Sequence, residues 1–150
     1  MVLLLLAWLF SQDPGAKAIE TAHLTVTAAS SQAAGKISLH ADVVPKPGMH
    51  VYAPGQKGYI AVTLTLDPAA PVTTAGKAKF PSGEKVLMPA LNETQLVYAQ
   101  PFRITQDVAI RRGTAAGPIT VKGTMRYQAC DDKMCYKPAT VPMEWRIPDR

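Results

Sequence analysis

The two cysteines of this 150-residue chain, Cys130 and Cys135, lie four residues apart in the stretch YQACDDKMCYKP, residues 127–138. Thiol–disulfide exchange needs an accessible thiolate and a second thiol close enough to resolve the mixed disulfide. Two cysteines across a tight turn meet the second requirement, since bridging needs Cα atoms within about 7 Å of each other. The pattern therefore predicts a redox site whose catalytic residues are Cys130 and Cys135.

Strands are expected on both sides of this turn. Residues 119–127 alternate apolar and polar side chains, and residues 141–147 do the same around Trp145. That alternation is the period of a half-buried strand. The two cysteines are therefore predicted to lie on the turn of a β-hairpin.

The charges in the turn act on a thiolate in opposite directions. Asp131 and Asp132 disfavour the thiolate, whereas Lys133 and Lys137 favour it, and no helix N-terminus is expected nearby to stabilise it. Such a site would react slowly until a partner docks, which suits an electron carrier. Tyr136 directly follows the second cysteine and is a candidate to shield it.

Two upstream side chains are candidates to neighbour the thiols. His50 and Tyr52 lie on one face of a short predicted strand, with Met49 and Val51 on the other. His50 is either a solvated strand histidine or a proton donor or acceptor beside the thiols. The sequence alone leaves both alternatives open.

The rest of the chain favours an all-β fold. Short extended segments separated by turns, together with 13 prolines and 10 glycines, predict an antiparallel β-sandwich with Trp145 in its core. No amphipathic helix or internal repeat is found. Residues 30–35 are expected to form a loop and residues 85–95 an irregular connection. Further strands are predicted at residues 22–28, 37–43, 60–66, 72–80, 96–98 and 102–110.

Composition and the N-terminus limit the function classes. The net charge of +5 comes from scattered lysines and arginines, so nucleic-acid binding is disfavoured. Residues 2–10 form an uninterrupted apolar run that suits an export signal or membrane anchor. We expect residues 1–18 to be this segment and its linker, and residues 19–150 to be one β-sandwich domain. Export would place the cysteines in an oxidising compartment, where they can pair.

The cysteine stretch closely resembles the active-site hairpin of the N-terminal periplasmic domain of the thiol:disulfide interchange protein DsbD. GMHVY at residues 48–52 is similar to that family's Gly-aromatic-aromatic-x-Tyr strand. The resemblance implies an immunoglobulin-like sandwich in the periplasm whose cofactor is the Cys130–Cys135 disulfide itself, with Cys135 forming the mixed disulfide. It also implies a membrane-embedded thiol electron donor and periplasmic thioredoxin-like acceptors. Cytochrome c biogenesis is one process that such a relay would serve.

The chain also departs from the family pattern. His50 stands where the family places an active-site tyrosine. The family's aromatic-Tyr-Gly cap signature is missing, and residues 85–95 supply Met88, Leu91 and Glu93 as candidates to cover the disulfide. The chain ends at Arg150 without the transmembrane and thioredoxin domains of the best-known members, which indicates a stand-alone relay or a fragment.

Two other function classes remain. An exported copper-binding sandwich would use the soft ligands of Met49, His50, Met88, Met134 and the cysteines. A non-catalytic interaction module would use the disulfide only as a staple, worth about 2 kcal/mol for so small a ring. Zinc is disfavoured because two cysteines and one histidine leave a tetrahedral site short of a ligand. The leading prediction is a redox domain with no bound metal.

Overall fold

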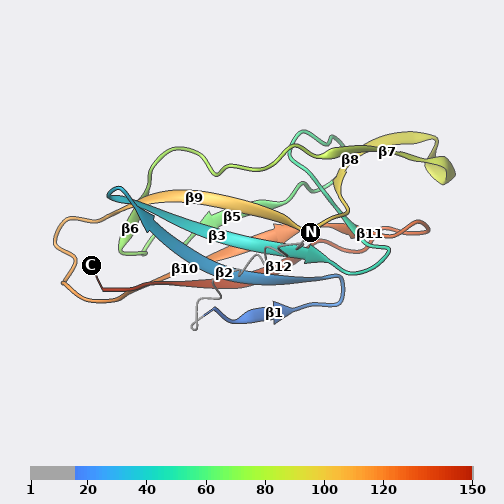
Figure 1. The fold of residues 1–150 in the computed structure, drawn as a ribbon. Helices are drawn as coiled ribbons and strands as arrows, with labels where there is room; N and C mark the ends of the chain where they lie inside the picture. Colours follow the sequence, from blue (N-terminus) through green and yellow to red (C-terminus); the bar gives the residue numbers. More distant parts are fainter. Residues whose placement is uncertain (1–15, 150) are drawn as a thin grey trace, which may run out of the picture.

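A computed structural model describes residues 16–149 of the chain, so the apolar run at residues 2–10 lies outside the described residues. The described part consists of strands and one 3-10 helix, η1 (Figure 1). The strands are β1 (Ala18–Glu20), β2 (Leu24–Ala33), β3 (Lys36–Pro45), β4 (His50–Tyr52), β5 (Thr63–Leu66), β6 (Val72–Thr74), β7 (Glu84–Met88), β8 (Glu93–Tyr98), β9 (Phe102–Ile110), β10 (Ile119–Tyr127), β11 (Ala129–Cys130) and β12 (Ala139–Ile147), and η1 is Pro89–Leu91. Within residues 16–149 no helix is long and apolar enough to cross a bilayer.

The strands form three antiparallel sheets. A five-stranded sheet, β1-β2-β3-β9-β6, packs against a three-stranded sheet, β12-β10-β5, and a four-stranded sheet, β11-β4-β8-β7, continues one end of the molecule (Figure 1). The fold is an immunoglobulin-like antiparallel β-sandwich, which confirms the predicted fold class. β1 begins at Ala18, one residue before the expected domain boundary.

The core of the sandwich follows the alternation seen in the sequence. β10 and β12 bury every second side chain, and Val121 pairs directly with Trp145 in their register. Trp145 is buried, and its indole N–H donates to the carbonyl oxygen of His40 in the opposite sheet at 2.8 Å. Burial of each large apolar side chain contributes about 1.5–3 kcal/mol, so these strands anchor the hairpin that carries the cysteines.

Gly123 in β10 permits the close approach of β5. A Cβ atom built on Gly123 would lie 2.5 Å from the carbonyl oxygen of Thr65 and 3.1 Å from the ring of Trp145. Any side chain here would therefore push β5 away from the sheet or displace the central tryptophan.

The loop predicted at residues 30–35 is wrong. β2 runs to Ala33 and pairs with β3 along its whole length, and Ala34 and Gly35 close the hairpin with φ angles of 52° and 76°. Two consecutive positive φ angles are typical of a type I′ hairpin turn. The end of β2 is largely exposed, so its small polar side chains resemble those of a loop. Backbone pairing with β3 holds the segment extended.

The irregular connection predicted at residues 85–95 is also wrong. β7 and β8 form a hairpin whose register pairs Glu84 with Val97 and Met88 with Glu93. η1 forms the tip, and Asn92 follows it with a left-handed φ of 47°. This hairpin extends the four-stranded sheet beyond the sandwich (Figure 1).

The four-stranded sheet has two different buried faces. One face, with Val51, Ala53, Tyr98 and Ala129, joins the main core. The other face forms a separate cluster of Tyr52, Val97 and Cys130, against which Tyr59 and Val86 pack. We call this second cluster the redox cluster. One of the two cysteines is therefore part of a packed apolar environment.

Candidate redox site

The two cysteines form a disulfide at the tip of the predicted hairpin, with Cα atoms 4.1 Å apart. Cys130 ends β11 and is fully buried, whereas Cys135 lies just beyond the turn and is exposed. Their backbones also form an isolated antiparallel bridge. Only one of the two cysteines is therefore exposed at the surface.

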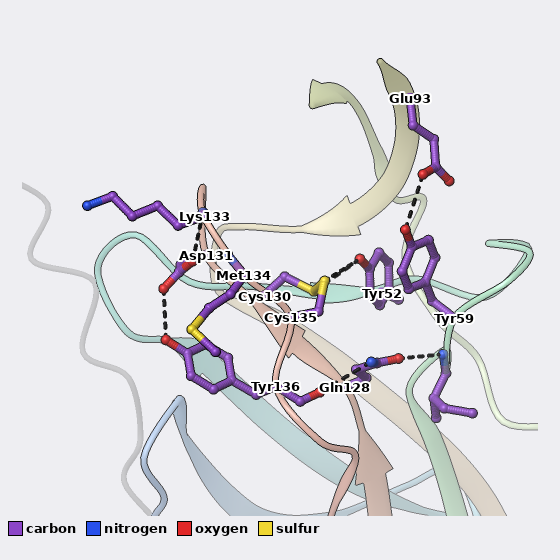
Figure 2. The surroundings of a disulfide bond; sticks show 11 residues. Tyr52, Tyr59, Glu93, Gln128, Cys130, Asp131, Lys133, Met134, Cys135 and Tyr136 are labelled. Atoms are coloured by element: carbon purple, nitrogen blue, oxygen red, sulfur yellow. Dashed lines mark hydrogen bonds between the residues drawn. A yellow bond between two sulfur atoms is a disulfide. The ribbon is translucent and has the colours of Figure 1, made fainter. Parts of the chain in front are cut away.

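Asp131 organises the turn between the cysteines. Its Oδ1 accepts hydrogen bonds from the backbone N–H groups of Lys133 at 2.8 Å and Met134 at 2.7 Å, and its Oδ2 accepts one from the Tyr136 hydroxyl at 2.8 Å. The backbone N–H of Lys133, followed by that of Met134, holds the pKa of Asp131 below its ordinary value. These three hydrogen bonds to Asp131 therefore fix the turn conformation. The side chain of Lys133 points away from the disulfide (Figure 2).

Tyr52 contacts the disulfide directly. Its hydroxyl oxygen lies 3.0 Å from Sγ of Cys130 and 3.2 Å from Sγ of Cys135 (Figure 2). Because disulfide sulfurs carry no proton, the phenol is the donor in this contact. Burial, with a smaller contribution from Tyr59, raises the pKa of Tyr52 to about 12. At neutral pH the hydroxyl therefore stays protonated and can donate to whichever sulfur gains negative charge.

Tyr59 stacks on the ring of Tyr52. The sequence analysis did not single out this residue. The two rings stack with centroids 4.4 Å apart and an interplanar angle of 18°, and the Tyr59 hydroxyl donates to the Glu93 carboxylate at 3.1 Å (Figure 2). The hydrogen bond to Glu93, and then burial, raises the pKa of Tyr59. This tyrosine lies in an irregular loop, so no periodicity in the sequence marked it.

The candidate cap residues occupy different positions on the β7–β8 hairpin. Glu93 reaches the site through Tyr59. Met88 ends β7 and is half-buried, whereas Leu91 lies in η1 at the tip with 54% of its surface exposed. Val86, which the sequence analysis did not single out, packs against the redox cluster.

His50 is buried next to the disulfide. It pairs with Cys130 in the register of β4 and β11, only 8% of its surface is exposed, and its ring meets Tyr52 edge-on at 6.0 Å. The alternative of a solvated strand histidine is therefore wrong. Burial lowers the pKa of His50, while Gln95 and the Asp131 carboxylate oppose that effect.

Gln95 is a further residue that the sequence analysis missed. Its side chain is 1% exposed, and it lies close enough to His50, Tyr52 and Tyr59 to influence the pKa of each. Nevertheless, neither of its amide atoms, nor Nε2 of His50, has a partner with hydrogen-bond geometry among residues 16–149. Buried polar groups without partners are uncommon and call for an explanation.

Tyr136 lies on the other side of the turn. Its ring stands 4.6 Å from that of His23, and its hydroxyl is bound by Asp131. Figure 2 shows the ring beside the turn and away from Tyr52. Gln128 ties this segment to the Tyr59 loop, because its amide donates to the Tyr136 carbonyl and accepts from the backbone N–H of Ile60.

The described residues contain no group of three or more His, Cys, Asp or Glu side chains that could hold a metal ion. The polar side-chain atom recorded against both sulfurs is the hydroxyl oxygen of Tyr52.

The profile of the family described as "Thiol:disulfide interchange protein DsbD, N-terminal" matches residues 18–144. The chain belongs to this family. The matched range contains both cysteines, His50, Tyr52 and the hairpin that carries Glu93.

Two solved structures are similar to this chain. The N-terminal domain of DsbD from Neisseria meningitidis, in its reduced form, is 18% identical, with 75% of this chain and 82% of that chain covered and a TM-score of 0.49. The N-terminal periplasmic domain of ScsB from Proteus mirabilis is 14% identical, with 89% of this chain and 50% of that chain covered and a TM-score of 0.53. The chain thus spans about half the length of the ScsB domain and shares its fold. No curated protein sequence matches the chain significantly.

Proposed function

We propose that this domain is a periplasmic thiol–disulfide interchange module that relays reducing equivalents through Cys130 and Cys135. The observation that carries the proposal is the asymmetry of the disulfide: Cys135 is an exposed residue just beyond the turn, whereas Cys130 is buried with the protonated phenol of Tyr52 against its sulfur. A purely structural disulfide needs neither an exposed cysteine nor a hydrogen-bond donor within reach of both sulfurs. The exchange requires no cofactor beyond the disulfide.

Reduction of the domain begins at Cys135. A partner thiolate attacks Sγ of Cys135, the sulfur–sulfur bond breaks, and the electron pair moves to Sγ of Cys130. The Tyr52 hydroxyl, 3.0 Å from that sulfur, donates a hydrogen bond to the departing thiolate. A second thiolate of the partner then attacks the mixed disulfide, so the partner leaves oxidised and both cysteines of the domain are reduced.

Oxidation of the domain follows the same path in reverse. The thiolate of Cys135 attacks the disulfide of an acceptor, and Cys130 then attacks Sγ of Cys135 and releases the reduced acceptor. Two electrons pass to the acceptor in each cycle. The exposed position of Cys135 supports its role as the sulfur that forms the mixed disulfide in both directions.

The proposed partners are a membrane-embedded thiol donor and thioredoxin-like acceptors in the periplasm. Family membership and the similar fold of a periplasmic ScsB domain support this assignment. Cys135 is an exposed residue just beyond the turn, which gives a partner access to it.

The test is a redox titration in a glutathione series, combined with single cysteine variants. The pair should cycle reversibly with a midpoint in the range of periplasmic exchange proteins. Cys130→Ser, which keeps the exposed thiol, should accumulate a mixed disulfide with a thioredoxin-like protein, and Cys135→Ser should not. A pair that stays reduced in air with an added disulfide oxidant, or that traps partners equally through either cysteine, would contradict the proposal.

A further inference from the structure

Polar groups that the exchange steps above do not use lie beside the redox cluster. His50 and Gln95 are both more than nine-tenths buried, and His50 Nε2 and both amide atoms of Gln95 have no hydrogen-bond partner among the described residues. All three atoms are placed on the face of the small sheet that also carries Tyr52 and Cys130. The alternation of side chains along β4 and β8 fixes this common face.

His50 is the titratable group directly across the strand pair from Cys130. In an antiparallel pair, the Cβ atoms of directly opposed residues are about 4.5–5.5 Å apart, so their side chains can meet. The ring also stands edge-on to Tyr52, which itself touches both sulfurs. The imidazole therefore belongs to the same packed group as the buried sulfur.

The thiol of the buried residue Cys130 cannot lose its proton directly to solvent, whereas Cys135 is an exposed residue. Before Cys130 can attack the mixed disulfide, its thiol must lose a proton, yet the residue has no exposed surface. Tyr52 cannot take that proton, because its hydroxyl is already protonated at neutral pH. A base beside the redox cluster is needed.

We propose that His50 is the base that removes the proton of Cys130 when this cysteine resolves the mixed disulfide, and that Gln95 is the residue that positions the imidazole. The inference rests on the proposed function and assigns a role within that site. In the resolving step, the proton moves from Sγ of Cys130 to the imidazole, and the thiolate attacks Sγ of Cys135. The acceptor then leaves as a thiolate with the electron pair of the broken bond. In the opposite direction, the imidazolium returns the proton to Cys130.

The charged surroundings of His50 fit this role. Burial lowers the pKa of the imidazole, which keeps it neutral and basic at neutral pH, and the carboxylate of Asp131 in the β11 turn stabilises the transient imidazolium. From β8, Gln95 also favours the charged form. The other ionisable groups on this side of the small sheet are Tyr52 on the same strand, Tyr59 on the following loop, and Glu93, which accepts a hydrogen bond from Tyr59.

The experiment follows the two steps separately with Ellman's reagent. The reduced domain attacks the reagent through Cys135 and releases one thionitrobenzoate, and resolution by Cys130 then releases a second. Stopped-flow absorbance across a pH series resolves the two phases. In the wild-type protein, the second phase should slow as pH falls through the pKa of His50, which lies below its ordinary value of 6.5.

The decisive variants are His50→Gln and His50→Tyr, the second of which keeps an aromatic ring against Tyr52. Both should slow the second phase by about 100-fold at neutral pH, within the range of general-base contributions. Both should also lose the acidic inflection while keeping the first phase. Gln95→Met should keep the inflection but move it to lower pH, because Gln95 favours the imidazolium.

His40→Gln is the matched control. His40 is also buried, burial likewise lowers its pKa, and its ring nitrogens bind Ser31 and Thr105 in the five-stranded sheet. This change should leave both phases and the inflection unaltered. A second phase that is unchanged in both His50 variants, or equally slowed in His40→Gln, would overturn the inference. Absence of a second phase in the wild-type protein would instead refute the proposed function.

Discussion

Removing the Tyr52 hydroxyl tests the electrostatic basis of the exchange. Tyr52→Phe deletes the only side-chain donor recorded within 3.2 Å of both sulfurs in the described part of the chain, and leaves the buried ring stacked on Tyr59. Because the hydroxyl lies 3.2 Å from Sγ of Cys135 in the disulfide form, we expect it to donate to the Cys135 thiolate in the reduced protein. A hydrogen bond to a charged group contributes about 1.5–3 kcal/mol, which corresponds to about 1–2 pH units in the ionisation of that thiol.

The rate effect is smaller than the ionisation effect. The thiolate fraction at neutral pH falls by about 10- to 100-fold, but a more basic thiolate is a better nucleophile, with a Brønsted coefficient of about 0.4–0.5. The net loss in exchange rate is therefore about 3- to 16-fold. Both quantities are measurable on one sample, by alkylating the reduced domain with iodoacetamide over a pH series and by timing its exchange with oxidised glutathione.

Tyr59→Phe is the matched control for this prediction. It deletes the same atom from the adjacent stacked ring, whose hydroxyl binds Glu93 and is not recorded in contact with sulfur. This variant should leave the alkylation midpoint close to that of the wild-type protein. If Tyr52→Phe gives an unshifted alkylation curve, or Tyr59→Phe shifts it equally, the hydroxyl does not stabilise the thiolate and the reasoning fails.

Two further predictions concern the scaffold. Gly123→Ala should lower the free energy of unfolding by about 1–3 kcal/mol, because its Cβ would lie 2.5 Å from the Thr65 carbonyl oxygen. Urea denaturation measures this loss, and an unchanged midpoint would show that β5 can move away freely. Asp107 is buried against Lys36 and Lys79, and the contact with Lys36, then that with Lys79, holds its pKa well below the ordinary value of 3.8. A depressed carboxyl pKa stabilises the fold above the ordinary value and loses that contribution as pH falls below it. Asp107→Asn should therefore flatten the acid dependence of the unfolding free energy, and parallel curves for the two proteins would contradict this assignment.

Much of the scaffold could be predicted because its determinants are local in the sequence. The strict alternation in β10 and β12 specified two half-buried strands, and both were found with the expected buried faces. The pairing of Cys130 with Cys135 was predictable for the same reason: five positions of separation across a turn leave the two thiols close together. The hairpins at residues 30–35 and 85–95 were mispredicted because backbone pairing with a neighbour, and not side-chain pattern, holds those segments extended.

The chemistry of the site was only partly determined by the sequence. The residue types and spacing determined that two thiols share one turn and that a histidine and a tyrosine lie on one face of a strand. Only the tertiary structure decided that Cys130 is buried and Cys135 exposed, that His50 lies across from the buried sulfur, and that Tyr59 and Gln95 complete the cluster. The positions of Cys130, His50 and Gln95 depend on pairing between strands about 45 to 80 residues apart in the sequence. Such burial is a property of the assembled sheet, which no local pattern encodes.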